Sequence, residues 1–194
     1  MEFIHERSAR VKVFEIGVDK ILIEGILRDE RFCPSFIYSL QQFMDPGIVH
    51  RIIVRMVLSL PKLIIESAEA EMTVVPMEMC KEVKDVVNKL VGLPLMRGFR
   101  ENVRKSLGGN TGCIHINNLL LFMNTAAIQG SYTYYSRVRE DGQLKRADFD
   151  GSLIVNSCHL WREDGPAAQR LEEMQKARHG VRGEKIKNKT DGAM

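Results

Sequence analysis

Apolar and polar residues alternate along the first half of the chain. The alternation covers four segments: residues 10–16, 20–29, 50–60 and 62–75. Successive side chains of a strand point to opposite faces of a sheet, so each segment would present one apolar and one polar face. Gly17 and Asp19 suit a tight turn between the first two segments. The pattern predicts an antiparallel meander with one face exposed to water.

The hydrophobic period changes in the second half. Apolar side chains recur every three or four residues in three segments: 82–92, 95–109 and 116–130. This spacing is typical of helices with one buried face. Gly92 and Pro94 would end the first helix, whereas residues 131–138 fit either a continuation of the third helix or a strand. The predicted fold class is therefore α+β, an antiparallel sheet of about four strands packed on one face by about three helices.

Length and charge favour one domain with a basic tail. A chain of 194 residues is long enough for one domain, which we predict over residues 1–166. Residues 167–194 hold seven Lys and Arg against four Asp and Glu, and this difference of +3 equals the net charge of the whole chain. We expect this tail to be mobile because it is polar and charged. The body is close to neutral, which disfavours a nucleic-acid-binding function.

The sequence predicts no membrane segment and no export signal. No run of about 18 apolar residues occurs, and the N-terminal residues lack the basic start and apolar core of a secretory signal. Four cysteines are too few and too scattered for a disulfide scaffold. We therefore expect a cytoplasmic protein with reduced cysteines. The sequence is compatible with a protein partner and with a homo-oligomer.

Cysteine and histidine residues gather at three places after the predicted strands. The candidates are Cys80, Cys113, His115, Cys158 and His159. Thiolate and imidazole are the usual ligands of zinc and also bind iron, so these five residues are the candidate metal ligands. The chain contains no C-x-x-C pair, so the spacing is not that of a zinc finger.

Two of these cysteines are predicted at the starts of helices. Cys80 precedes the first predicted helix, and Cys113 precedes the third. Unpaired backbone N–H groups at a helix start stabilise negative charge, which makes a thiolate a better nucleophile and a better ligand. Residues two apart in a helix do not share a face, so Cys113 and His115 converge only if Cys113 caps the helix. The three glycines within residues 108–112 permit such a turn.

Other cysteine and histidine residues have ordinary structural explanations. Cys33 is interpreted as a packing residue, because a buried cysteine behaves as a small apolar side chain. His50 opens a predicted strand and is expected at the surface, and His5 lies near the chain end. Cys158 and His159 are adjacent, so they would point to opposite faces if their segment were a strand.

Four stretches occur in a recognisable order along the chain. They are Pro76 with Cys80, LVGLPLMRGF (90–99), GGNTGCIH (108–115) and SCHLWREDGP (157–166). Together they resemble a family of bacterial proteins known only as a domain of unknown function. Members of that family typically read G-C-T-H-L where this chain reads GCIHI. The resemblance implies a G-C-[T/I]-H motif at a helix start and an S-C-H…D-G-P motif, and it implies no activity.

A more distant resemblance, to iron–sulfur scaffold proteins of the NifU type, concerns architecture. Those proteins run strands, then a cysteine that leads into a helix, a bend, and a later cysteine that opens another helix. Cys80, the LVGLPL bend (90–95) and Cys113 follow that order. The scaffold family uses a further cysteine, which has no match here unless Cys158 supplies it. The resemblance implies a fold and does not fix a function.

Three functional hypotheses are open at this point. The leading one is a zinc or iron site formed by Cys80, Cys113 and His115, with Cys158 or His159 completing the coordination. The second is an enzyme with Cys113 as nucleophile and His115 or His159 as base, acting on a thioester or other small acyl compound. The third is an accessory protein that binds a larger enzyme through its sheet edge or its basic tail.

Overall fold

The computed structural model describes residues 1–96, 98–138, 151 and 154–176. The contacts divide the chain into two compact units, Met1–Asp148 and Phe149–Met194. The first unit contains a sheet with packed helices, and the second contains turns and a helix. Each unit is described by itself.

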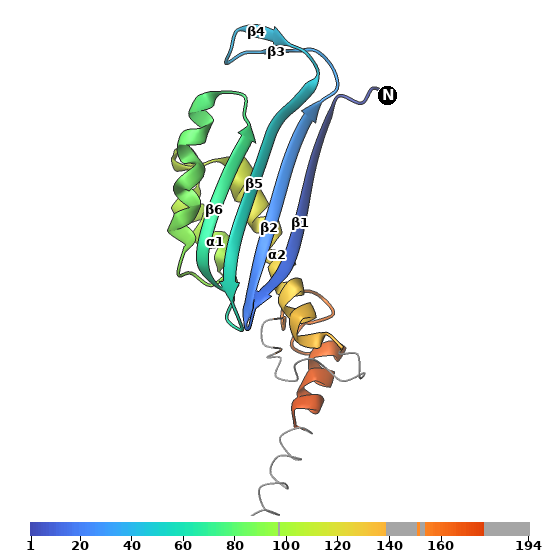
Figure 1. Ribbon diagram of the computed structural model, residues 1–194. Helices are drawn as coiled ribbons and strands as arrows, with labels where there is room; N and C mark the ends of the chain where they lie inside the picture. Colours follow the sequence, from blue (N-terminus) through green and yellow to red (C-terminus); the bar gives the residue numbers. More distant parts are fainter. Residues whose placement is uncertain (97, 139–150, 152–153, 177–194) are drawn as a thin grey trace, which may run out of the picture. The chain divides into compact units, whose positions relative to one another are not determined.

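A four-stranded antiparallel sheet forms the centre of the first unit (Figure 1). Its strands, in spatial order, are β1 (His5–Gly17), β2 (Lys20–Arg31), β5 (Gly47–Ser59) and β6 (Ile64–Val74). The four alternating segments of the sequence fall on these four strands, so the predicted meander is confirmed. β1 and β2 form a hairpin whose turn includes Asp19 with a positive φ of 55°.

A small hairpin interrupts the meander between β2 and β5. It consists of β3 (Ser35–Ile37) and β4 (Gln42–Met44), which form a separate two-stranded sheet. Figure 1 shows this hairpin beyond the end of the main sheet. The rings of Phe36 and Phe43 pack edge to face across it, with centroids 5.1 Å apart. The chain therefore leaves β2 and re-enters the sheet at β5 by a long path.

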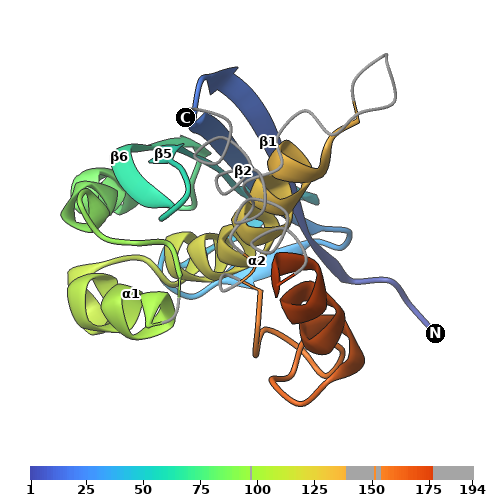
Figure 2. The ribbon, with the colours of Figure 1, turned by 90° about the horizontal axis from the view of Figure 1, so that it is seen from below.

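The helices of the first unit follow the sheet in sequence. They are the 3-10 helices η1 (Glu78–Leu90) and η2 (Gly109–Thr111) and the α-helices α1 (Phe99–Leu107) and α2 (Ile114–Ser136). Figure 2 shows α1 and α2 on the same side of the sheet. The fold class is thus α+β, as predicted. Residues 131–136, which fitted a helix or a strand, continue α2. None of the described helices combines the length and the apolar composition that crossing a membrane requires.

The core lies between the inner face of the sheet and α2. Ile23 on β2 and Val54 on β5 are fully buried, as are Leu120 and Met123 on α2. Gly25 lies beneath α2, where an added Cβ would be only 2.6 Å from the Sδ atom of Met123. The absence of a side chain at this position lets the helix approach the sheet closely, and this contact fixes where α2 crosses β2.

The second unit contains turns over residues 154–165 and a helix over residues 166–176. Ile154 and Ala168 are its buried apolar residues within the described part. The predicted tail begins at residue 167, and its described part is helical. Residues 177–194 lie outside the described residues.

Candidate metal centre

Asp29 is a carboxylate on the apolar face of the sheet. It continues the row of inward-facing residues toward the end of β2, and it is only 1 % exposed. A buried ionised carboxylate requires hydrogen bonds or opposite charge to offset its lost hydration. Asp29 obtains these from three other elements, through Arg7 on β1, His50 on β5 and His115 on α2.

Arg7 is the direct strand partner of Asp29 in the β1–β2 hairpin. Its Nε atom lies 2.6 Å from Oδ1 of the carboxylate, and its Nη2 atom lies 2.7 Å from Oδ2. Two parallel hydrogen bonds of this kind form the strongest type of ion pair in proteins. His5, two residues earlier on the same face of β1, places its Nε2 atom 3.9 Å from Oδ1.

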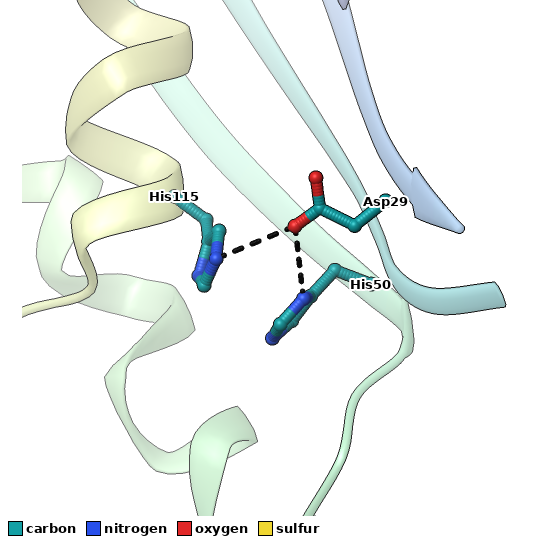
Figure 3. A group of neighbouring side chains, drawn as sticks. All are labelled: Asp29, His50 and His115. Atoms are coloured by element: carbon teal, nitrogen blue, oxygen red, sulfur yellow. Dashed lines mark hydrogen bonds and ion pairs between the residues drawn. The ribbon is translucent and has the colours of Figure 1, made fainter. Parts of the chain in front are cut away.

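Two histidines approach the same carboxylate from the other side (Figure 3). His50 is the strand partner of Asp29 on β5, and its Nδ1 atom lies 3.0 Å from Oδ2. His115 belongs to the first turn of α2, and its Nε2 atom lies 3.4 Å from the same oxygen. The two imidazole rings stack, with centroids 3.9 Å apart and planes inclined by 31°.

These groups shift each other's protonation. Burial raises the pKa of Asp29, but the hydrogen bonds and charge of Arg7, with smaller effects from the two histidines, outweigh it and hold that pKa below its usual value. Burial, followed by the charges of His50 and Arg7, lowers the pKa of His115 to about 4 against the opposing effect of Asp29. Burial also lowers the pKa of His50 more than Asp29 raises it. At neutral pH the carboxylate is therefore ionised and both imidazoles are uncharged.

The cluster of Asp29, His50 and His115 can hold a metal ion. One ligand atom from each residue lies within 4.8 Å of the other two. Two neutral imidazoles and a carboxylate form a ligand set that suits zinc and non-haem iron. Without a metal, Nδ1 of His50 can donate a hydrogen bond to Oδ2, and Nε2 of His115 lies 3.4 Å from the same oxygen. Both nitrogens can bind a cation when they carry no proton.

The glycine-rich loop before α2 delivers Cys113 and His115. A Cβ on Gly108 would lie 2.2 Å from a backbone carbonyl oxygen of α1, and one on Gly112 would lie 2.1 Å from another. Only glycine fits either position, so the two residues explain the tight path of the loop. Cys113 is the N-cap of α2, with extended backbone angles. Its Sγ atom lies 3.6 Å from Nδ1 of His115, so these two side chains are in contact.

Cys113 is next to the cluster but not part of it. Its thiol faces Nδ1 of His115, whereas Nε2 on the other side of the ring faces Asp29. In many metal sites the second ring nitrogen of a histidine ligand is held by a neighbouring acceptor. In this protein the thiol of Cys113 faces that second nitrogen, Nδ1 of His115.

The other predicted ligands lie elsewhere. Cys80 is a partly buried residue of η1, and within the described residues its thiol does not join the converging group. Cys158 and His159 are exposed residues of the second unit, in turns rather than a strand. Nε2 of His159 lies 3.4 Å from Nη1 of Arg162. The assignment of these three residues as ligands stays a prediction.

Asp29 and His50 are the cluster members that the sequence analysis did not single out. In the sequence, Asp29 looks like an ordinary charged residue at the end of an apolar strand, so nothing marks it as buried. His50 was expected at the surface, but only 15 % of its side chain is exposed. Counting the hairpin register back from the pair of Gly17 and Lys20 would place Ser8 opposite Asp29, but a bulge between Glu15 and Gly17 shifts the pairing by one residue to Arg7. Residues 32–46, which separate β2 from β5, prevent the same count for His50.

The chain belongs to the family described as Protein of unknown function (DUF2889), whose model matches residues 5–129. This match confirms the family resemblance inferred from the sequence, and the matched range contains Asp29, His50 and His115. It ends before the SCHLWREDGP stretch, so that motif stays a prediction, as does the likeness to NifU-type scaffold proteins. Comparisons with curated proteins and with solved structures gave no match.

Proposed function

We propose that this protein binds a divalent transition-metal ion, zinc or iron, through Asp29, His50 and His115. The observation that supports the proposal is the convergence of one carboxylate oxygen and two imidazole nitrogens at a buried point between β2, β5 and α2. The three residues come from distant parts of the chain, yet their ligand atoms lie within 4.8 Å of one another.

The protonation of the cluster supports metal binding at neutral pH. A histidine must be uncharged to bind a metal, and the pKa of both rings is lowered, that of His115 to about 4, which favours the uncharged form at neutral pH. Arg7 binds both carboxylate oxygens of Asp29, and Oδ2 is the oxygen that also faces the two rings. Three protein ligands leave coordination positions for water or a small ligand, which is the arrangement of catalytic sites.

Elemental analysis tests this proposal. The full chain, purified without a chelator or a histidine tag and then offered Zn²⁺ or, under anaerobic conditions, Fe²⁺, should retain about one ion per chain. His50→Gln and His115→Gln should lose most of that metal. His159→Gln is the matched control, since His159 is an exposed histidine of the other unit, and it should bind as the wild type does. Wild-type protein that retains no metal, or equal retention in all four proteins, would exclude the site.

The contact between Cys113 and His115 favours a second function, an enzyme with a thiol nucleophile. When the ring proton of His115 is on Nε2, which lies 3.4 Å from Oδ2 of Asp29, Nδ1 can accept the proton of Sγ. Sγ would then attack the carbonyl carbon of a thioester, the C–S bond to the leaving thiolate would break, and His115 would return the proton to that thiolate. Backbone N–H groups in the first turn of α2 lie next to Sγ and could bind the carbonyl oxygen.

The two functions make opposite demands on His115. A metal at Nε2 moves the ring proton to Nδ1, and Nδ1 can then no longer accept a proton from Cys113. Metal-bound protein should therefore have an inert Cys113, and metal-free protein should have a reactive one.

Labelling with iodoacetamide, followed by peptide mass spectrometry, tests the thiol function. In metal-free protein Cys113 should react faster than the exposed Cys158, and His115→Gln should slow Cys113 alone. Cys158 is the internal reference because accessibility by itself would make it react faster. Slower labelling of Cys113 than of Cys158 in the wild type would exclude a thiol enzyme.

A further inference from the structure

Arg31 is a second arginine on the inner face of the sheet, two residues beyond Asp29 on β2. The intervening Glu30 points to the outer face, where it accepts a hydrogen bond from Arg28. Strand alternation therefore places Arg31 on the same face as Asp29. Its strand partner on β1 is His5, whose side chain also approaches Asp29.

The guanidinium of Arg31 lacks a counterion among the described residues. Its Nε and Nη1 atoms are buried, yet neither has a hydrogen-bond partner there. An arginine stays charged at any physiological pH, and burying its N–H groups without acceptors costs free energy. Such a donor pair is expected where a ligand supplies the missing acceptor.

The neighbouring groups leave a positive excess around Arg31. Asp29 is the carboxylate of the cluster, and it is already paired with Arg7. The first turn of α2 begins at this same end of β2, since His115 contacts Asp29, and no side chain caps its backbone N–H groups. Helix starts of this kind attract anions.

We infer that the site takes an anionic ligand whose carboxylate or phosphate group binds Arg31 beside the Asp29–His50–His115 cluster. The inference deepens the proposed function and rests on it, because it places an anion subsite two residues along the same face of β2 from the proposed metal ligand Asp29. The contact with Arg31 itself does not depend on the metal. The structure thus supplies an anion site in which the guanidinium gives charge and unpaired N–H donors at Nε and Nη1.

Titration of the metal-free, full-length protein with inorganic phosphate and with acetate tests the inference. Calorimetry or ¹H–¹⁵N NMR of the arginine side chains would follow binding. The wild type should bind at least one of the two anions, and the tighter one identifies the group as a phosphate or a carboxylate. Arg31→Gln should weaken that binding about tenfold, the usual worth of a hydrogen-bonded charge pair.

Arg28→Gln is the matched control, because Arg28 lies on the same strand but on the outer face, paired with Glu30. It should bind the anion as the wild type does. Arg31→Lys keeps the positive charge and is the control for the case in which Arg31→Gln loses binding because it misfolds. Arg31→Lys should bind the anion more tightly than Arg31→Gln does. The inference fails if neither anion binds the wild type, or if Arg31→Gln and Arg28→Gln bind equally.

Using metal-free protein separates the inference from the proposed function. If His50→Gln loses the metal but binds the anion as the wild type does, the result supports the anion site at Arg31 independently of the metal. Intact metal binding in a protein that binds neither anion would retain the metal centre and exclude the anion site.

Discussion

A single buried carboxylate organises the residues of this site. Asp29 accepts two hydrogen bonds from Arg7 and lies within contact distance of His50 and His115. Arg7 offsets most of the cost of burying the charge, which allows both histidines to stay uncharged. A carboxylate without Arg7 would instead favour charged imidazoles, and charged imidazoles do not bind metals. Arg7 would thus favour metal binding at the proposed centre without being a ligand itself.

Replacing Asp29 by asparagine should destabilise the protein by about 2 kcal/mol, because it breaks a buried ion pair whose arginine is partly exposed. Glu24→Gln is a comparison on the outer face, where Glu24 lies 2.8 Å from Arg55. Loss of that partly exposed pair should cost less than about 1 kcal/mol. Urea denaturation of both variants measures the difference. Equal stabilities would mean that the Asp29–Arg7 pair contributes no more than a surface pair.

The low pKa of His115 predicts how stability changes with pH. An unfolded histidine takes up a proton below its ordinary value of 6.5, whereas the folded His115 does so only below about 4. Between these values the unfolded state binds more protons, so the free energy of unfolding should decrease as the pH falls from 6.5 toward 4. With allowance for solvent screening, the decrease is about 2 kcal/mol.

Urea denaturation of metal-free protein at a series of pH values between 7 and 4 measures this slope. His115→Gln removes the titrating ring and should flatten the curve, while His159→Gln, in the other unit, should leave it unchanged. His50 should add to the wild-type slope in the same direction, since its pKa is also lowered. A slope that is identical in His115→Gln and the wild type would contradict the assigned pKa.

At the scale of elements, α2 positions His115 against the sheet. Two glycines determine how closely α2 packs on the strands. Gly25 on β2 faces the flexible Met123, whereas Gly130 on α2 faces Val13 of β1. An added Cβ at Gly130 would lie 2.6 Å from Cγ1 of Val13. Valine cannot move its branched side chain away as methionine can. The contact at the far end of α2 is therefore the less tolerant one.

Gly130→Ala should lower stability by about 1 kcal/mol, because the clash with Val13 outweighs the better helix propensity of alanine. Gly25→Ala should cost less, since Met123 can adopt another rotamer. The double variant Gly130→Ala with Val13→Ala should recover stability relative to Gly130→Ala alone. Denaturation of the three variants measures the order. A Gly130→Ala protein as stable as the wild type would show that α2 is not tightly seated on β1.

The elements themselves could be predicted from local patterns, and the site only in part. Alternation predicts β2 because its inward residues are apolar up to Leu27. Helical spacing predicts α2 because its buried residues are apolar and recur every three or four positions. Gly108 and Gly112 correctly indicated a tight turn that brings Cys113 to His115. The meeting of Asp29 with His50 depends on strand register across residues 32–46, which no local pattern encodes.

At the scale of the whole molecule, the site belongs entirely to the first unit. Arg7, Asp29, His50 and His115 all lie within residues 5–129, the range that the family model matches. The second unit, Phe149–Met194, begins after that range. Because each proposed metal ligand and Arg31 come from the sheet and α2, the chemistry of the site should not require the second unit. The basic tail is then free to serve another purpose, such as binding a partner.

A chain that ends at Asp148 should fold and retain the metal. It keeps all four strands of the main sheet, the helices that cover the inner face, and every proposed ligand. Circular dichroism should show the spectrum of a mixed α+β protein, and elemental analysis should give the same metal content per chain as the full protein. The contrary outcome is that the shortened chain folds but loses its metal while full-length His159→Gln retains it. In that case a residue of the second unit other than His159 contributes to the site, and Cys158→Ser is the next variant to test. If metal content is unchanged, Cys158 and His159 are excluded as ligands, and the three-residue centre of the first unit is sufficient.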